Sequence, residues 1–548
     1  MDPFSRIIID AFRNPACYPH PIGEVTIVET HISWVILTGQ YAYKIKKSVS
    51  FSFVDFSTLE RRRWFCEEEV RLNRRLAPKV YLGVVPLTGS PLAPRIEGAG
   101  PPFEFAVKMQ QFSSGQEVYN ILASKEQSEV FISKLAHCIA QFHTQIEKIG
   151  EESCYANPDM IWRSVGECVD EISLHLLTQN TQEWLIQINR WLQEEWRRLY
   201  DDFLQRKQSG YVRECHGDLH LANIAVFQGN VCVFDALEFE PRLRWIDVMS
   251  EVAFLVMDLQ KNGRRDLAFL FLNGYLEETG DYAGLAVFRF YQVYRALVRA
   301  KVAGLRVEQL DKGSGEWERT RQEMIDYLEL SYRLLKPSSP FLIMMHGVSG
   351  IGKTTVSAEV VKALGAIRIR SDVERKRLGV RKREAERDEE CVTDLYSSTM
   401  TQATYDLLRD LANTILRAGY SVVVDATFLR TSQRAPFLLL VQGLQRSLVI
   451  LDVWAPQQVL VYRIERRTQK AHDASDATLG VLQQQQEIGD SFTEGESLNV
   501  FRVDSTNAHS LQLVLKKISE KLMPPFLTVM GYEMAFRSHV FLFSYLPI

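Results

Sequence analysis

The stretch FLIMMHGVSGIGKTT at residues 341–355 decides the fold of the second half of the chain. An apolar run of the length of a buried strand leads directly into the pattern Gly-x-x-x-x-Gly-Lys-Thr. Glycines let the backbone wrap around a polyphosphate with its N–H groups turned inward, and the following helix adds the positive end of its dipole. The pattern therefore predicts a phosphate-binding loop, with nucleotide contacts from Gly347, Ser349, Gly350, Ile351, Gly352, Lys353, Thr354 and Thr355.

Two side chains of this loop carry chemistry of their own. Lys353 is placed to reach the β and γ oxygens of a nucleotide. The Thr354 hydroxyl is placed to coordinate Mg²⁺. ATP and Mg²⁺ are therefore the expected cofactors.

The second half alternates between strand-like and helical patterns. Its apolar, β-rich runs lie at residues 341–346, 366–370, 420–425 and 448–454. This alternation is typical of a parallel sheet covered by helices, so we expect an α/β fold.

Polar residues at the ends of these runs are candidate partners of the phosphate loop. Asp372 opens a helix and can accept a proton from an attacking hydroxyl, and Arg375, one turn later, can hold a substrate phosphate. Asp425 ends a buried run as a metal-binding carboxylate would. Arg463 and Arg467 are four residues apart, so both can neutralise charge on a transferring phosphoryl group. The alternatives are a helix cap for Asp372 and a solvated helix face for the two arginines.

On these residues, the segment 341–523 resembles P-loop kinases of the polynucleotide-kinase and zeta-toxin-like type. The resemblance rests on the phosphate loop, the D-x-x-R arrangement of Asp372 and Arg375, Asp425 and the two later arginines. It implies a kinase fold in which those arginines belong to a lid.

The first half has a different order of patterns. Its β-rich runs lie mostly between residues 25 and 46, with a helix near 58–76 and a further strand near 103–109, and mainly helical sequence follows. This order predicts an α+β fold with a small, mainly β lobe and a larger helical lobe.

A second phosphotransfer motif lies in this half, in CHGDLHLAN at residues 215–223. Asp218 can orient or deprotonate a hydroxyl, and Asn223 can hold a metal. A short β-rich run then ends at Asp235, which can bridge a metal to phosphates. The spacing of these three residues suits phosphoryl transfer.

The nucleotide of this site also needs a cation and a carboxylate that holds it. Lys44 fits the Ala-x-Lys pattern of a kinase strand, and Lys46 shares its face by strand alternation and is the alternative. The partner should come from the following helix, where Glu67, Glu68 and Glu69 are consecutive. Glu68 and Glu69 can both face inward, and we prefer Glu68.

The first half, over about residues 25–330, resembles the aminoglycoside phosphotransferase and choline kinase group of protein-kinase-like folds. The segment 29–33 has no glycine, so it is not a protein-kinase glycine-rich loop. The combination of halves resembles bacterial proteins that join an aminoglycoside phosphotransferase-like half to a P-loop ATP-binding half. This resemblance implies a bilobal kinase-like fold followed by a P-loop kinase.

Composition and a segment rich in proline and serine complete the prediction. The sequence KPSSP suits a linker, so we expect a kinase-like domain at 1–335, a linker at 336–340, a P-loop domain at 341–523 and an apolar tail at 524–548. A net charge of −4 gives no global field for nucleic acid. No segment has the length of a membrane span, and no secretory signal opens the chain, so we expect a cytoplasmic protein.

The leading functional hypothesis is an ATP-dependent phosphotransferase with two nucleotide sites, each transferring a γ-phosphoryl group to a hydroxyl acceptor. One alternative is a nucleotide-regulated switch protein with a degenerate kinase site. Another is a nucleic-acid 5′-end kinase in the second half, which the global charge does not favour. The expected partners are a nucleotide and a hydroxyl-bearing substrate, and no membrane.

Overall fold

The computed structural model describes residues 8–522, apart from short gaps and two longer ones. The segments left out are 31, 52–53, 113–115, 151, 337–338, 387–396, 469–481, 484 and 486. The predicted apolar tail at 524–548 therefore lies outside the described residues. Within the described part, no helix has the length and hydrophobicity needed to span a membrane.

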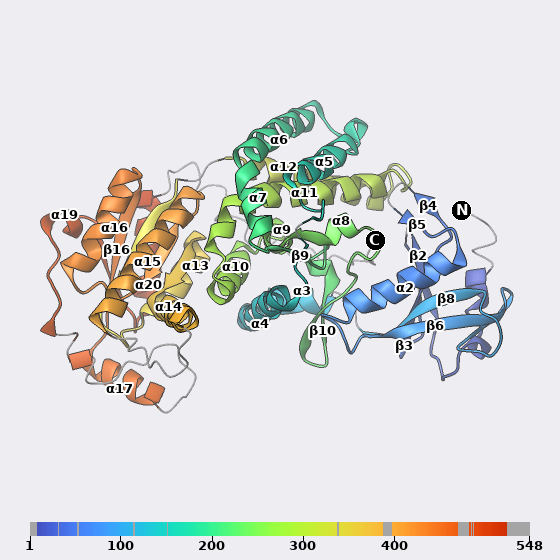
Figure 1. The fold of residues 1–548 in the computed structure, drawn as a ribbon, viewed down its shortest axis with the longest axis horizontal. Helices are drawn as coiled ribbons and strands as arrows, with labels where there is room; N and C mark the ends of the chain where they lie inside the picture. The colour runs from blue at the N-terminus through green and yellow to red at the C-terminus, as the bar shows by residue number, and fades with distance from the viewer. Residues whose placement is uncertain are drawn as a thin grey trace. The chain divides into compact units, whose positions relative to one another are not determined.

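The first half begins with a β lobe. Among the described residues its main sheet has six strands in the order β1-β2-β3-β8-β6-β7, paired antiparallel throughout. Helix α2 (Leu59–Asn73) packs on β6 and β8 (Figure 1). The strands are β1 (Thr26–Glu29), β2 (Ser33–Leu37), β3 (Tyr41–Lys46), β6 (Tyr81–Ser90), β7 (Ala93–Ile96) and β8 (Glu104–Gln110).

A mainly helical lobe follows. Its helices are α3 (Gln116–Ala123), α4 (Lys125–Gln145), α5 (Pro158–Asp170), α6 (Gln179–Arg198), α7 (Tyr200–Gln208), α9 (Val248–Lys261), α11 (Leu285–Val307) and α12 (Gly315–Leu334). Two short antiparallel strand pairs between α7 and α9 flank the motif residues. These are built from β9 (Val212–Glu214), β10 (Ile224–Phe227), β11 (Asn230–Val233) and β12 (Trp245–Asp247). The α+β fold predicted for this half, with a small β lobe followed by a larger helical lobe, is confirmed.

The second half is a parallel α/β sheet. Its five described strands have the order β14-β15-β13-β16-β17, and every pairing is parallel. They are β13 (Phe341–His346), β14 (Ile367–Arg370), β15 (Val422–Asp425), β16 (Ser447–Trp454) and β17 (Val500–Asp504). The helices between and after them are α13 (Lys353–Leu364), α14 (Ser371–Glu386), α15 (Ser398–Arg417), α16 (Thr431–Gly443), α17 (Gln457–Thr468), α19 (Glu494–Ser497) and α20 (Ala508–Leu522). The predicted α/β class is confirmed, and β17 is an additional strand.

The chain forms two compact units, and two segments of the predicted first domain, 259–289 and 332–335, fall in the second unit. The first unit holds the chain up to Asp258 together with Phe290–Ser331. Residues Leu259–Arg289 belong instead to the unit that holds the parallel sheet. This segment contains helix α10 (Arg265–Thr279), which packs on α13 and β14 of that unit.

Candidate phosphotransfer sites

The phosphate loop connects β13 to α13. Its backbone has positive φ at Gly347 (132°), Gly350 (84°) and Gly352 (104°), a region that side-chain-bearing residues rarely adopt. A Cβ atom at Gly347 would lie 2.8 Å from the carbonyl oxygen of Val453. The loop conformation therefore requires glycine, as the motif predicts.

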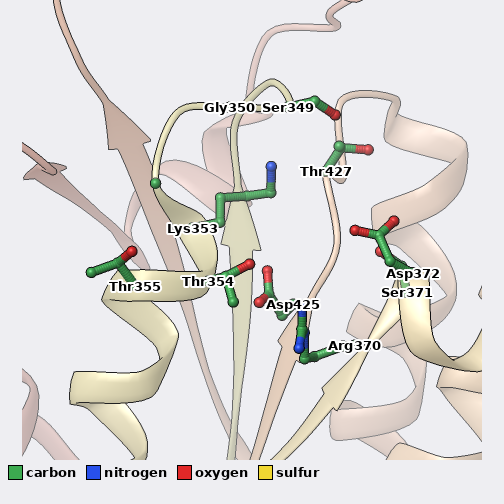
Figure 2. Close-up of a pocket in the computed structure, with 11 residues that line it drawn as sticks. Ser349, Gly350, Lys353, Thr354, Thr355, Arg370, Ser371, Asp372, Asp425 and Thr427 are labelled. Carbon is green, nitrogen blue, oxygen red and sulfur yellow. The ribbon is translucent and has the colours of Figure 1, made fainter. Parts of the chain in front are cut away.

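A cavity lies above this loop, at the carboxyl ends of β13, β14 and β15 (Figure 2). Figure 2 shows Lys353, Thr354 and Asp425 on one side of the cavity and Asp372 facing them from the start of α14. The Lys353 ammonium donates a hydrogen bond to the carbonyl of Val348 at 2.9 Å. The cavity is lined by Ser349, Gly350, Gly352, Lys353, Thr354, Thr355, Arg370, Ser371, Asp372, Asp425 and Thr427.

Thr354 and Asp425 form a donor set that suits Mg²⁺. Asp425 is buried at the end of β15, and its Oδ2 accepts a hydrogen bond from the Ser357 hydroxyl at 3.1 Å. Thr354 lies in the first turn of α13 and lines the same cavity. Hydroxyl and carboxylate oxygens are the ligands that Mg²⁺ prefers, so these two residues fit the metal.

Asp372 lies at the start of α14 and lines the cavity. Burial raises the pKa of the Asp372 carboxyl, and the Arg375 guanidinium acts in the opposite direction. The two side chains are 3.9 Å apart and lie in the first turn of α14. A carboxylate with a raised pKa is better matched to accepting a hydroxyl proton near neutral pH.

Of the two arginines predicted to act on the phosphoryl group, the structure describes the side chain of Arg463 but not that of Arg467. Arg463 donates hydrogen bonds to the carbonyl of Ile351 at 2.8 Å and to the Ser505 hydroxyl at 2.9 Å. It therefore contacts the backbone of the phosphate loop and is not among the residues that line the cavity, so its predicted role toward the phosphoryl group stays a prediction. Its guanidinium is held there because a loop carbonyl and a hydroxyl both accept from it. The side chain of Arg467 lies outside the described residues.

The second site is the loop at residues 215–223, between β9 and β10. Asn223 donates from Nδ2 to the backbone carbonyl of Asp218 at 3.0 Å and to its carboxylate at 2.9 Å. Its Oδ1 is buried and has no hydrogen-bond partner among the described residues. A buried carbonyl oxygen without a donor is a suitable metal ligand, so Asn223 fits the predicted metal role.

Asp218 lies close to His220 and Arg299. The His220 Nε2 atom lies 3.3 Å from the Asp218 carboxylate and 3.2 Å from the Arg299 guanidinium. Burial acts to raise the pKa of Asp218, but His220 and Arg299 hold this pKa below its usual range. Asp218 is therefore an anion that can orient a hydroxyl acceptor.

The predicted cation of this site is Lys44, and its helix partner is Glu69. Lys44 Nζ lies 2.7 Å from Asp235 and 3.0 Å from Glu69. Our preference for Glu68 is wrong, because Glu68 pairs with Arg71 and Arg244. Glu69 lies on the buried face of α2, with Cys66, Val70 and Asn73, whereas Glu68 is one residue out of phase with that face.

Lys46 and Glu238 complete the charge cluster around Glu69. Lys46 has no solvent exposure in its side chain, and its Nζ lies 2.7 Å from Glu69 and 2.5 Å from Glu238. Both lysines therefore contact the Glu69 carboxylate, and Lys44 is the one that also contacts Asp235. Sequence analysis did not find Glu238, although its position three residues after Asp235 was a usable signal.

A buried pair anchors the same catalytic loop. Glu251 of α9 accepts a hydrogen bond from the backbone N–H of Gly217 at 2.7 Å and contacts the His143 ring at 2.8 Å. Sequence analysis missed this pair because both residues lie inside apolar helical patterns. The contact fixes the loop one residue before Asp218.

The fold and the two sets of residues define a phosphotransferase-type enzyme, with a protein-kinase-like half followed by a P-loop half. A family model described as AAA domain matches residues 342–489. The uncharacterized protein Rv2004c of Mycobacterium tuberculosis (strain ATCC 25618 / H37Rv) is 30% identical over 471 residues, which cover 85% of this chain and 91% of that protein. The uncharacterized protein Mb2027c of Mycobacterium bovis (strain ATCC BAA-935 / AF2122/97) matches with the same identity and coverage. The chain belongs to the family of these mycobacterial proteins.

Solved structures show likenesses to each half. A gluconokinase from Sinorhizobium meliloti 1021 is 20% identical with a TM-score of 0.25, covering 34% of this chain and 97% of that chain. A choline/ethanolamine kinase family protein from Mesorhizobium loti is 9% identical with a TM-score of 0.34, covering 60% of this chain and 99% of that chain. The predicted P-loop half agrees with the family match at residues 342–489.

Proposed function

We propose that the protein is an ATP-dependent phosphotransferase with two nucleotide sites, each transferring a γ-phosphoryl group to a hydroxyl acceptor. The observation that carries the proposal is the cavity of the second half. A phosphate loop, a hydroxyl–carboxylate pair suited to Mg²⁺ and a carboxylate suited to accept a proton line this one cavity. These are the parts that phosphoryl transfer requires.

At this site the acceptor oxygen forms a bond to the γ-phosphorus, and the bond from the γ-phosphorus to the bridging oxygen of ADP breaks. The acceptor proton passes to Asp372, and the loop N–H groups and Lys353 balance charge on the phosphates. Mg²⁺ held by Thr354 and Asp425 would supply further positive charge at the β and γ oxygens. Arg375 is placed to hold an anionic group of the acceptor, being one helical turn from Asp372.

In the first half we assign the corresponding roles to the residues of the kinase-like site. Lys44, held by Glu69, contacts the nucleotide phosphates, and Asp235 with Asn223 holds Mg²⁺. Asp218 orients the acceptor hydroxyl. The support for this assignment is the 2.7 Å Lys44–Asp235 contact and the buried Asn223 oxygen that lacks a donor.

The test is transfer of label from [γ-³²P]ATP to a pool of sugars, polyols, amino alcohols and nucleosides. We expect labelled product with the full-length protein, and loss of all product when Asp372→Asn and Asp218→Asn are combined. Asp410→Asn, an exposed substitution of the same kind on α15, is the matched control and should transfer normally. Transfer that persists in the combined variant would refute the proposed acceptor-side roles.

A further inference from the structure

Helix α10 packs against the edge of the parallel sheet of the second half, although it lies more than sixty residues before the phosphate loop in sequence. Strand β14 is an edge strand of that sheet. The side-chain amide of Asn273 donates to the carbonyl of Ala366 at 3.0 Å and accepts from the N–H of Arg368 at 2.6 Å. One side chain of α10 thus takes the place of a neighbouring strand, which is one way to protect a sheet edge.

A second side chain of α10, Glu277, reaches the arginines of β14. Arg368 donates from Nε to Glu277 at 2.8 Å, and Arg370 lies 3.5 Å from the other carboxylate oxygen. All three side chains are at most 17% exposed, so this is a partly desolvated cluster rather than a surface contact. The backbone carbonyl of Glu277 also accepts a hydrogen bond from Arg377 at 2.6 Å, which fixes the end of α10 against α14.

One of these arginines, Arg368, also contacts the helix that carries Thr354. Arg368 donates to the backbone carbonyl of Thr354 at 3.3 Å and to the Ser357 hydroxyl at 3.4 Å. Ser357 in turn donates to Asp425 at 3.1 Å. The Glu277 carboxylate is therefore linked through one arginine and one serine to the carboxylate assigned to Mg²⁺.

Arg370 is directly beside that carboxylate. Arg370 and Asp425 are register partners in the parallel pairing of β14 with β15, so their side chains leave the same face of the sheet. Both line the cavity (Figure 2). A guanidinium at this position is a natural partner for Asp425, and the Glu277 carboxylate, 3.5 Å from Arg370, is a competing partner for the same guanidinium.

We propose that Glu277 is a positioning residue of the P-loop site: it holds Arg368 and Arg370 so that Asp425 remains available to Mg²⁺. The inference rests on the proposed function of this site. Without the carboxylate, Arg370 turns to Asp425 and competes with the metal. Residues that hold metal ligands or their neighbours typically change metal affinity by about 10- to 100-fold when they are replaced.

The experiment is a Mg²⁺ titration of ATP binding to the full-length protein, following the binding event that Lys353→Ala removes. We expect Glu277→Gln to raise the Mg²⁺ midpoint by about tenfold or more, with saturating Mg²⁺ restoring binding. Glu278→Gln, the same substitution at the adjacent exposed position, should leave the midpoint unchanged. Glu277→Gln combined with Arg370→Gln should return it to within about threefold of wild type, because the competing cation is gone.

A folded Glu277→Gln protein with an unchanged Mg²⁺ midpoint would overturn the inference, as would a double variant no better than the single one. Should Glu277→Gln fail to fold, Glu277→Asp decides: its carboxylate is one methylene shorter and loses the 3.5 Å contact to Arg370, so a raised Mg²⁺ midpoint supports the inference and an unchanged one overturns it. If wild type has no Mg²⁺-dependent ATP binding that Lys353→Ala removes, the proposed function of this site fails first. If wild type does bind ATP in this way and Glu277→Gln leaves the Mg²⁺ midpoint unchanged, the positioning role is refuted and the proposed function of the site stands.

Discussion

Replacing Lys46 by methionine removes the most deeply buried cation of the first half while keeping a side chain of similar length. Lys46 is wholly buried between Glu69 and Glu238, with its Nζ 5.0 Å from the centre of the Phe56 ring. After Lys46→Met, those two buried carboxylates would have only Lys44, which also contacts Asp235. The variant thus leaves a buried carboxylate without a counter-charge.

The size of the effect follows from this burial. Removing one partner of a buried ion pair destabilises a protein by about 3–5 kcal/mol. For a unit of about 300 residues, with an unfolding entropy of about 2 cal/mol/K per residue, this lowers Tm by roughly 5–8 °C. Differential scanning calorimetry of the full-length protein measures the shift.

Two further variants make this prediction specific. Lys46→Met combined with Glu238→Gln should recover at least half of the lost Tm, because the unpaired charge is removed together with its partner. Lys134→Met, at an exposed position of α4, is the matched control and should change stability by no more than about 0.5 kcal/mol. A Lys46→Met protein whose Tm lies within about 1 °C of wild type would refute the reasoning, because a shift of that size is what a surface substitution gives.

Three other predictions concern the first half. Glu69→Gln should weaken Mg·ATP binding at this site in a nucleotide titration and Glu68→Gln should not, because Glu69 alone of the two contacts the site lysine. Burial acts to raise the pKa of Glu251, but nearby buried histidines hold it at about 2 against an ordinary 4.5. About 3 kcal/mol of stability is therefore present above pH 4.5 and lost as the pH falls toward 2, and Glu251→Gln should lack this loss in a series of Tm measurements against pH. Asp235→Asn should lose Mg·ATP binding at this site, whereas Asp218→Asn should keep it and lose transfer by orders of magnitude in the label assay.

Local sequence was sufficient where chemistry depends on consecutive residues. The phosphate loop needs glycines at fixed positions, and the positive φ of Gly347 and its 2.8 Å approach to Val453 show why the pattern is so specific. The buried strand that ends at Asp425 was predictable for a similar reason. A short, fully apolar run that ends in a carboxylate is typical of a central strand with a polar residue at its carboxyl end.

Side-chain direction on a helix was less predictable. Consecutive residues of a helix point about 100° apart, so the inward direction of Glu68 or Glu69 depends on the helix phase. That phase is set by Cys66, Val70 and Asn73, which pack inward, and α2 as a whole carries too few apolar residues to reveal it. The hydrogen bond of Arg463 to the loop carbonyl of Ile351 was not predictable either, because nothing in the local sequence indicates it.

Long-range packing was not predictable at all. Helix α10 lies in sequence among the helices of the first half, and its buried residues indicate a core helix without saying which core it joins. Its assignment to the parallel sheet depends on single polar contacts, such as the Asn273 amide on β14 and the Glu277 carboxylate on Arg368. A fragment that begins at residue 336 would lack both contacts, so nucleotide binding is best measured on the full chain.

The central claim, two nucleotide sites on one chain, is tested most directly by the number of nucleotides that the chain binds. Equilibrium dialysis of the full-length protein with labelled ATP and saturating Mg²⁺ measures this number. The account predicts two nucleotides per wild-type chain, one in Lys353→Ala, one in Asp235→Asn and none when the two substitutions are combined. One nucleotide per wild-type chain, or a number that Lys353→Ala leaves unchanged, would contradict it.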